Sequence, residues 1–484
     1  MKFVIALLTL LFGIACSWDC SVELNRFLCT EVTSISDIVD AVDDENVIAI
    51  DFDDSTISLI TRGFFDSLTQ PITLVRLDQC QVNTIEAGAF NGMKDLTELH
   101  LETNNILDIR ADMFKGLKNL VTLHLGDNKL VEILPETFNH LKKLETLDLN
   151  NNNIEEIVSG TFKSLFRLKK LYLNGNNLVH INPEVFESLK SLEDLHLDYN
   201  NLVELRPKVF KSLYSLKKLH IDHNSLSEIV PGTFHSLNSL VELDLNSNNL
   251  DKLIPGVFNS LTSLEFLDLS YNNINIIQPE TFKSLVSLET LNLEQNNINE
   301  LPSGIFDPFV SLKELNLNSN NFAKINSGVF KAMVSLEMIR LSDNNLKTIS
   351  KNYFHDLPSL EELHLNENYI ADVDEQAFEH LGVLDTIDLS NNALTSILFK
   401  SNTNTLSLDN NKITSFDVEK LHEYLPKLSN VTLNGNPWEC NSLLHVVKTL
   451  KKQDISIYDE NEEAEGTNVY GVSCYWNYNK IGKY

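Results

Sequence analysis

Basic residues are scarce in this chain. Its 484 residues include 38 Lys and Arg against 68 Asp and Glu, a formal net charge of −30 at pH 7. Nucleic acids and anionic membrane surfaces require clustered Lys and Arg, so we expect neither as a partner. The catalytic patterns H-E-x-x-H, G-x-S-x-G, the phosphate-binding loop and Cys-x-x-Cys are also absent. We therefore expect a non-enzymatic protein without a cofactor.

Long apolar runs are absent after the first residues. Residues 1–16 contain Lys2, the run FVIALLTLLFGIA and a small residue, which is typical of a secretory signal peptide and too short for a membrane span. Cleavage after Ala15 and cleavage after Cys16 both fit. No later stretch approaches 18 apolar residues, so the sequence predicts neither membrane insertion nor a glycolipid anchor. We expect a secreted, extracellular protein.

What the chain does contain is a repeat. Between Cys80 and Asn392 the same frame recurs thirteen times at steps of 24 residues, for example LTELHLETNNI (96–106) and LKKLYLNGNNL (168–178). A period of this length indicates a solenoid. The alternation in Leu99-His100-Leu101 predicts a short strand with both leucines inward and His100 facing water. The strand needs the next repeat to satisfy its backbone, so the repeats should stack into a parallel sheet.

Two further columns follow the same step. A Phe recurs from Phe90 to Phe378 and should fill the core on the side away from the sheet. An Asn recurs in the turn after each strand, where an amide can both donate and accept hydrogen bonds. Cys80 occupies this position in its repeat and is expected to be a buried, unreactive thiol. The column comprises Asn104, Asn128, Asn152, Asn176, Asn200, Asn224, Asn248, Asn272, Asn296, Asn320, Asn344, Asn368 and Asn392.

From about Ile50 to Pro437 the sequence resembles the 24-residue class of extracellular leucine-rich repeat proteins. The resemblance implies an α/β leucine-rich repeat solenoid, a curved horseshoe with a parallel sheet on the concave face and mostly loops on the convex face. Prolines such as Pro183 and Pro231, just after the strand and turn, argue against long convex helices. Similar families include Toll-type ectodomains, Slit-like proteins, small leucine-rich matrix proteins and secreted immune proteins of arthropods.

The chain divides by sequence into a signal peptide (1–16), an N-terminal cap (17–46), the repeats (47–436) and a C-terminal cap with its tail (437–484). About 17 strands are expected, one of them in a shortened repeat, TNTLSLDNNKI (403–413). Segment 442–452 has apolar residues at helical spacing that should cover the last repeat, namely Leu443, Leu444, Val447 and Leu450.

The cysteines fit disulfide-closed caps. Cys20 and Cys29 precede the repeats, and Cys440 and Cys474 follow them, so we expect one local disulfide at each end. The C-terminal segment NPWEC (436–440) resembles the cap of extracellular leucine-rich repeat proteins. That cap usually carries Cys-x-Cys, whereas Ser442 stands at the second position here, so only the Cys440 to Cys474 bridge is expected.

Histidines recur in the outward slot of several strands, where adjacent copies should stack. They could form a proton-sensitive surface or a metal site, or merely fill a slot that tolerates any polar residue, and we predict no metal. Aspartates in the same slot lack the ligand spacing of a calcium loop and are expected to be solvated. The histidines are His100, His124, His196, His220 and His364, and the aspartates are Asp148, Asp244, Asp268 and Asp388.

The concave face is the expected ligand-binding surface, since its outward side chains do not support the core. Aromatic anchors gather within five consecutive strands, although they could simply decorate the sheet. The candidate residues are Tyr172, His196, Asp198, Tyr199, His220, His223, Phe266 and Tyr271.

These observations predict binding to a protein ligand or receptor in innate immunity, adhesion or extracellular signalling. The alternative is a structural matrix component or carrier with multivalent contacts. A sequon at Asn430-Val431-Thr432 predicts glycosylation of Asn430, beside one end of the concave face. The ligand and the oligomeric state do not follow from the sequence.

Overall fold

The computed structural model describes residues 19–23, 26–30, 32, 47–53, 55–457 and 468–476, and the side chain of Cys20 is not among the described atoms. The signal peptide, most of the N-terminal cap and the acidic segment 459–466 lie outside this part. The chain forms two compact units, which we describe one by one. Unit 1 runs to Ser225 and includes Thr233–Leu237, and unit 2 comprises Leu226–Gly232 and the chain from Asn238 on.

Unit 1 is a stack of short parallel strands. A hairpin of β1 (Asp19–Glu23) and β2 (Arg26–Thr30) precedes them, and β2 pairs in parallel with β3. The register then advances by one repeat per strand, so that Leu99 lies beside Leu123 and Leu123 beside Leu147. The strands are β3 (Ala49–Asp53), β5 (Leu74–Arg76), β7 (Glu98–His100), β8 (Thr122–His124), β10 (Thr146–Asp148), β12 (Lys170–Tyr172), β13 (Asp194–His196) and β14 (Lys218–His220).

Unit 2 repeats this arrangement with the same parallel register. Counted over the described residues of both units, the repeats make about 17 turns, as the sequence predicts. The strands are β15 (Glu242–Asp244), β17 (Phe266–Asp268), β19 (Thr290–Asn292), β20 (Glu314–Asn316), β21 (Met338–Arg340), β23 (Glu362–His364), β25 (Val383–Asp388), β26 (Asn402–Ser407), β27 (Asn430–Thr432) and β28 (Ser456–Ile457).

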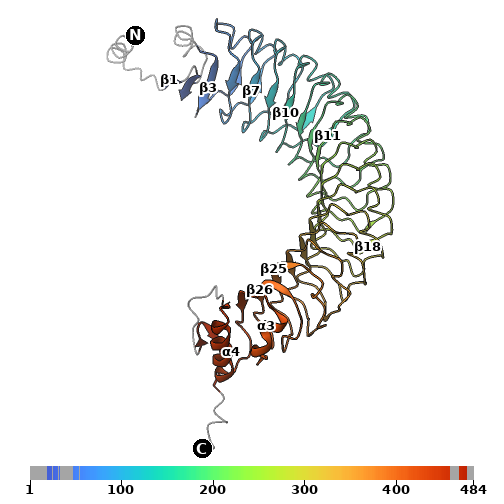
Figure 1. Cartoon of the computed structure of the whole chain (residues 1–484). Helices are drawn as coiled ribbons and strands as arrows, with labels where there is room; N and C mark the ends of the chain where they lie inside the picture. The colour runs from blue at the N-terminus through green and yellow to red at the C-terminus, as the bar shows by residue number, and fades with distance from the viewer. Residues whose placement is uncertain are drawn as a thin grey trace, which may run out of the picture. The chain divides into compact units, whose positions relative to one another are not determined.

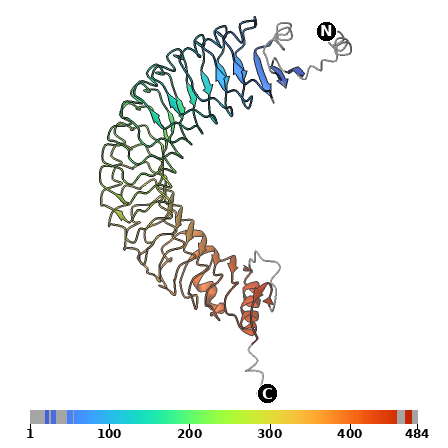
Figure 2. The ribbon, with the colours of Figure 1, turned by 180° about the vertical axis from the view of Figure 1, so that it is seen from behind.

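Within each unit the strands line the inner side of the curve and turns form the outer side (Figures 1 and 2). In the described residues the α-helices are α3 (Leu421–Tyr424) and α4 (Cys440–Lys452), beside the 3-10 turn η2 (Val418–Lys420). The expected convex face without long helices is confirmed. Unforeseen two-residue strands pair between neighbouring repeats there: β4 (Leu59–Ile60) with β6 (Thr84–Ile85), β9 (Glu132–Ile133) with β11 (Glu156–Ile157), β16 (Lys252–Leu253) with β18 (Ile276–Ile277), and β22 (Thr348–Ile349) with β24 (Asp372–Val373).

The asparagine column satisfies the backbone of the turns. Asn200 Nδ2 donates to the carbonyl oxygens of Leu173 and Leu197 at 2.9 and 3.1 Å, and its Oδ1 accepts from the N–H of Leu178 at 3.0 Å. Each amide thus ties its own turn to the preceding repeat. Cys80 is a fully buried thiol that donates to the carbonyl of Phe52, as expected for this position.

Behind the sheet, the phenylalanines pack ring to ring. Phe114, Phe138 and Phe162 are completely buried, with successive ring centroids 6.3 and 6.2 Å apart. Together with the leucines, which are also buried, these rings form a continuous core in each unit. The column ends where Phe399, just before the shortened repeat, meets Phe378 edge to face at 5.2 Å. There the chain has little room for a convex loop and forms the long strands β25 and β26 instead.

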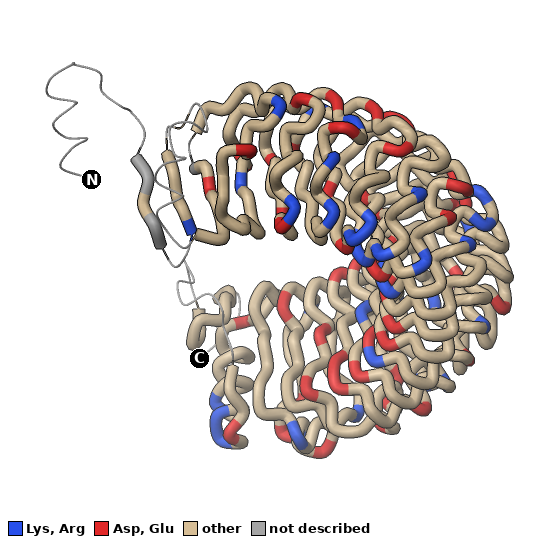
Figure 3. Tube along the Cα trace, turned by 90° about the horizontal axis from the view of Figure 1, so that it is seen from above, with Lys and Arg blue, Asp and Glu red and all other residues tan. Residues whose placement is uncertain are grey.

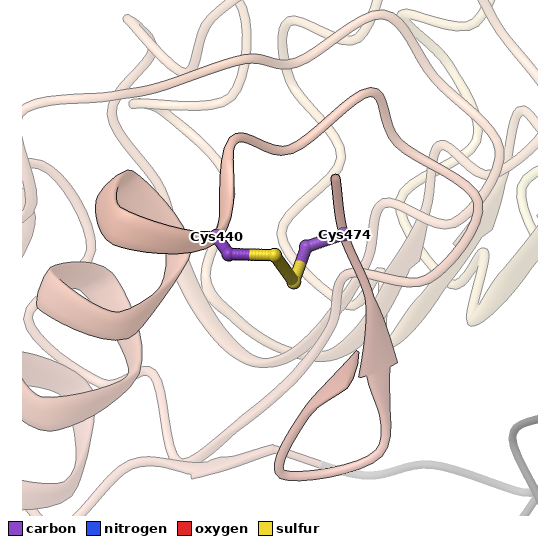
Figure 4. The surroundings of a disulfide bond; sticks show 2 residues. All are labelled: Cys440 and Cys474. Carbon is purple, nitrogen blue, oxygen red and sulfur yellow. A yellow bond between two sulfur atoms is a disulfide. The ribbon is translucent and has the colours of Figure 1, made fainter. Parts of the chain in front are cut away.

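The C-terminal cap is helix α4 held by a disulfide. Cys440, the first residue of α4, is bonded to Cys474 as predicted (Figure 4). Leu443, Val447 and Leu450 are buried, but Val446 is buried where we expected Leu444, which stays partly exposed. The buried face of α4 is therefore rotated slightly about the helix axis from the predicted one.

At the other end, the hairpin register sets Cys20 directly opposite Cys29. The Cys29 side chain is buried. The side chain of Cys20 lies outside the described atoms, so the Cys20 to Cys29 disulfide stays a prediction. Among the described helices none has the length and apolar character needed to cross a bilayer.

Candidate functional site

Each short strand turns its middle residue into the core and its two flanking residues outward. In unit 1 the third residues of successive strands therefore lie side by side. We call this set the third-position row. It comprises Asp51, Arg76, His100, His124, Asp148, Tyr172, His196 and His220.

The first histidine pair of the row is stacked, as predicted, with ring centroids 4.6 Å apart. The expectation that His100 faces water is wrong, however, because it is only 8% exposed. The His124 ring covers the His100 ring, and Nδ1 of His100 lies 3.1 Å from the Glu102 carboxylate. His124 Nδ1 contacts Asp148 at 3.3 Å, and this hydrogen bond raises the pKa of His124. The outward slot is partly enclosed rather than freely solvated.

A second cluster lies farther along the row. Tyr172 packs on one side of His196 at 4.8 Å between centroids, and His220 stacks on the other side at 4.4 Å with its ring within 10° of parallel. The His196 nitrogens lie 3.1 Å from Asp194 and 3.4 Å from Asp198. Burial acts to lower the pKa of His196, but these two carboxylates outweigh it and raise the pKa to about 9. His196 therefore carries a proton at neutral pH.

The next exposed feature is an aromatic pair in the turns. Tyr199 and His223 follow β13 and β14, and their rings stack at 4.1 Å. Both residues have left-handed backbones, with φ of 51° and 50°. Tyr199 is 57% exposed. Unit 1 thus brings together six of the candidate ligand-binding residues: Tyr172, His196, Asp198, Tyr199, His220 and His223.

The other two candidates belong to unit 2. Phe266 is the first residue of β17 and is partly exposed. Tyr271 occupies the turn position that Tyr199 has in unit 1, with φ of 52° and 56% exposure. That all eight residues form one ligand-binding surface stays a prediction.

The aspartates of the outward slot serve the backbone, which corrects the expectation that they are merely solvated. Asp148 Oδ1 accepts the N–H of Asn150 at 3.0 Å, and Asp268 and Asp388 do the same for Ser270 and Ser390. Each carboxylate therefore holds the turn that follows its strand. The sequence offered a signal for this role, since an Asp two residues before an unpaired N–H commonly forms such a turn.

Sequence reasoning also missed Asp194. It is the first residue of β13, two residues before His196, so both side chains emerge on the same face of the strand. The alternation Asp-Leu-His was the available signal. In unit 2, His364 stands in a comparable position, with its Nε2 3.1 Å from Glu362. A shallow polar depression surrounds it, lined by Asn318, Ser319, Arg340, Ser342, Asp343, Asn366, Glu367 and Asp388.

The sequon residue Asn430 begins β27 and is partly exposed. Its Nδ2 donates to the Ser429 hydroxyl at 3.1 Å. The side chain therefore lies on the outward side of the sheet, and its glycosylation stays a prediction.

A family model described as "Leucine rich repeat" matches residues 70–130, 95–154, 118–178, 142–202, 190–250, 240–298, 310–370 and 358–401. These overlapping segments extend over well more than half of the chain. No curated protein matches the sequence significantly.

Several solved structures are similar. A chain in the glycosylated Toll–Spatzle complex of Drosophila matches with a TM-score of 0.70 at 19% identity, over 91% of this chain and 70% of that one. A leucine-rich repeat protein of Leptospira interrogans matches with a TM-score of 0.65 at 28% identity, over 80% of this chain and 95% of that one. The leucine-rich repeat domain of APL1B matches with a TM-score of 0.54 at 26% identity, over 69% of this chain and 94% of that one. At 19% identity, the similarity to the chain in the Toll–Spatzle complex concerns the fold alone.

Proposed function

Since the chain belongs to the leucine-rich repeat family, we propose that it is a secreted, non-enzymatic recognition protein that binds a protein ligand through its strand surface. Innate immunity, adhesion and extracellular signalling are the settings in which such binding would act. The Cys440–Cys474 disulfide supports an oxidising, extracellular compartment, and so does the signal peptide predicted at residues 1–16.

The observation that carries this proposal is the exposed aromatic and histidine cluster of unit 1. Tyr172, His196 and His220 stack along the strands, and Tyr199 stacks on His223 beside them. Stacking fixes these rings before a ligand arrives, so binding costs little side-chain entropy. Rigid aromatic side chains that remain partly exposed are the usual anchors of protein interfaces.

The charge supports a protein ligand over other macromolecules. A net charge of −30 opposes the polyanionic backbone of a nucleic acid. Carboxylates surround the cluster, for example Asp194 and Asp198. A protein that presents basic and aromatic side chains complements this combination. The Toll–Spatzle structure is itself a complex of two proteins, which is a statement about Toll.

The test compares three forms of the full chain as baits in extracellular fluid of the source organism, with mass spectrometry of the captured proteins. The binding variant carries Tyr199→Asn and Tyr271→Asn. Asn suits this turn, because Asn151 and Asn391 occupy the same position with φ of 48° and 55°. The control is Tyr214→Asn, which removes an equally exposed tyrosine, 55%, from a turn between strands.

We expect a partner that the wild type and the Tyr214→Asn variant retain and that the double variant binds at least ~10-fold more weakly, as for loss of interface anchors. The melting temperatures of all three should agree closely. Equal capture by all three baits would reject the strand surface as the binding site. Retention only in insoluble extracellular material would favour a matrix component instead.

A further inference from the structure

Three potential metal ligands converge on the strand surface of unit 1. Asp194 and His196 emerge on one face of β13, and the register sets His220 of β14 directly beside His196. One ligand atom from each residue lies within 4.8 Å of the others. Residues on a rigid sheet hold such an arrangement better than residues on loops.

The spacing of the first two ligands already suits a small metal ion. Asp194 Oδ1 lies 3.1 Å from His196 Nε2. Zinc bonds of about 2.0–2.1 Å in tetrahedral geometry separate neighbouring ligand atoms by about 3.3 Å. The His220 ring is nearly parallel to that of His196, and one of its nitrogens lies within 4.8 Å of the other two ligand atoms.

The surroundings of His196 also resemble those of a metal ligand. Its other nitrogen, Nδ1, faces Asp198 Oδ1 at 3.4 Å. Metal-binding histidines generally direct their second nitrogen to a carboxylate, which leaves Nε2 to bind the metal once its proton is displaced. The Tyr172 ring on the far side of His196 limits its rotation.

Asp194 supplies a third argument. Its Oδ1 is shielded from solvent and accepts no hydrogen bond of good geometry, although the His196 nitrogen is close. A metal ion that replaces the proton of His196 would bind this shielded carboxylate oxygen directly. Its side chain is only 17% exposed, and that of His196 24%.

We propose that Asp194, His196 and His220 bind one divalent transition-metal ion, with Zn²⁺ as the ion they fit best. Two imidazoles and a carboxylate select zinc, copper or nickel over calcium and magnesium, which prefer oxygen ligands alone. The fourth position remains open to water or to a side chain of a bound protein. The metal site does not depend on the proposed function.

The chain contains its own control. His100 and His124 form a similar stacked pair, at 4.6 Å, in the same strand positions. The Nδ1 atom of His100 contacts Glu102, whereas that of His124 contacts a different carboxylate, Asp148. On the neighbouring strand, the positively charged Arg76 lies beside His100. Within the part of the chain that the structure describes, this pair belongs to no group of three converging ligands.

The experiment is calorimetric titration of Zn²⁺ into the full chain, freed of metal by chelation, at about pH 7.4, where Zn²⁺ displaces the proton of His196 as it binds. We expect about one tight site per chain, no comparable heat with Ca²⁺ or Mg²⁺, and visible absorption bands of tetrahedral Co²⁺ when Co²⁺ replaces Zn²⁺. His196→Ala and Asp194→Asn should each weaken binding at least ~10-fold, as loss of a ligand does. His124→Ala should leave it unchanged.

Circular dichroism establishes that each variant is folded, and His220→Gln replaces any variant that is not. The proposal is overturned if the wild type binds no Zn²⁺ in the micromolar range. It is equally overturned if His196→Ala, Asp194→Asn and His220→Gln bind Zn²⁺ as the wild type does, or if His124→Ala loses it to the same extent. None of these outcomes bears on whether the strand surface binds a protein.

Discussion

A single ladder asparagine stabilises two repeats at once. The two N–H groups of Asn200 are shared among the carbonyls of Leu173, Leu197 and Asp198, and its own oxygen accepts the N–H of Leu178. No other side chain of this size offers two donors and an acceptor in a buried turn. This explains why the position recurs as Asn throughout the regular repeats.

Replacing Asn200 with Ala should therefore lower the free energy of unfolding by about 2–4 kcal/mol, because buried carbonyls and an N–H lose their partners. The matched control is Asn201→Ala, the next residue, whose side chain is exposed. That change should stay within about 0.5 kcal/mol. Urea unfolding of both variants measures the difference, and equal losses would show that the amide contacts of the ladder contribute little.

The protonated His196 predicts a pH dependence of stability. Its folded pKa of about 9 lies above the ordinary value of 6.5. A raised histidine pKa stabilises the folded state fully below pH 6.5, and this contribution disappears as the pH rises through 9. In chelator, the wild type should lose on the order of 2 kcal/mol across this window.

The same measurement on His196→Gln provides the control, since glutamine keeps the polarity without the titration. The difference between the two proteins should shrink from pH 6.5 to 9. A constant difference over that range would mean that His196 is not protonated when folded.

Residue roles divide into those that the sequence predicts and those that it does not. The ladder and the Phe column repeat every 24 residues, so each copy has the same neighbours and one interpretation serves all. Outward residues differ from repeat to repeat. His100 is buried because the particular side chains around it are His124 and Glu102, and a partner on another strand does not follow from local sequence.

At the scale of elements, the strands are too short to be stable alone. Most contain three residues, and each depends on the strands on either side. The ends of the array consequently need covers. At the C-terminus α4 packs Leu443, Val447 and Leu450 inward, and Cys474 holds its first turn through Cys440.

Removing this bridge should loosen the cap first. The double variant Cys440→Ser and Cys474→Ser lacks the disulfide, which joins residues 34 apart in the sequence. A disulfide of this kind stabilises the folded state by about 2–4 kcal/mol, mainly because it restricts the unfolded chain. Hydrogen exchange should accelerate in α4 and β28, while β8 to β13 remain protected. Lys448→Ser, on the exposed side of α4, is the control. Uniform acceleration over both units would contradict a local cap.

Most of the repeating elements followed from the sequence, but several others did not. The main strands and α4 were expected because apolar spacing defines them. The convex pairs such as β9 with β11 were not, since two residues carry no detectable pattern. The six-residue strands β25 and β26 arise from the missing loop of the shortened repeat, which only the packed structure makes evident.

At the scale of the molecule, acidic residues outnumber basic ones, and both are scattered over the two units (Figure 3). Some pairs are close, such as Lys169 with Glu145 and Lys313 with Glu289, both at 2.7 Å. These pairs are partly exposed and contribute little. The net charge of −30 must therefore produce repulsion within the folded chain.

Salt should consequently stabilise the protein. Raising NaCl from about 20 mM to about 500 mM shortens the screening length from roughly 20 Å to roughly 4 Å, which weakens the net repulsion. We expect the melting temperature to rise by about 2–5 °C. KCl at the same ionic strength should give the same rise, because screening depends on ionic strength rather than on the cation. A fall in melting temperature with salt would mean that the ion pairs outweigh the repulsion.

We propose that outward side chains of the strands recognise a protein while the buried columns maintain the fold. Hydroxyl-radical footprinting of the complex with the captured partner tests it most directly, because it reports the solvent exposure of individual Tyr and His side chains. Binding through the strand surface should protect Tyr172, Tyr199 and His223, with Tyr214 labelled as strongly as in the free chain. Protection of Tyr214 with unchanged labelling of Tyr172 and Tyr199 would contradict it.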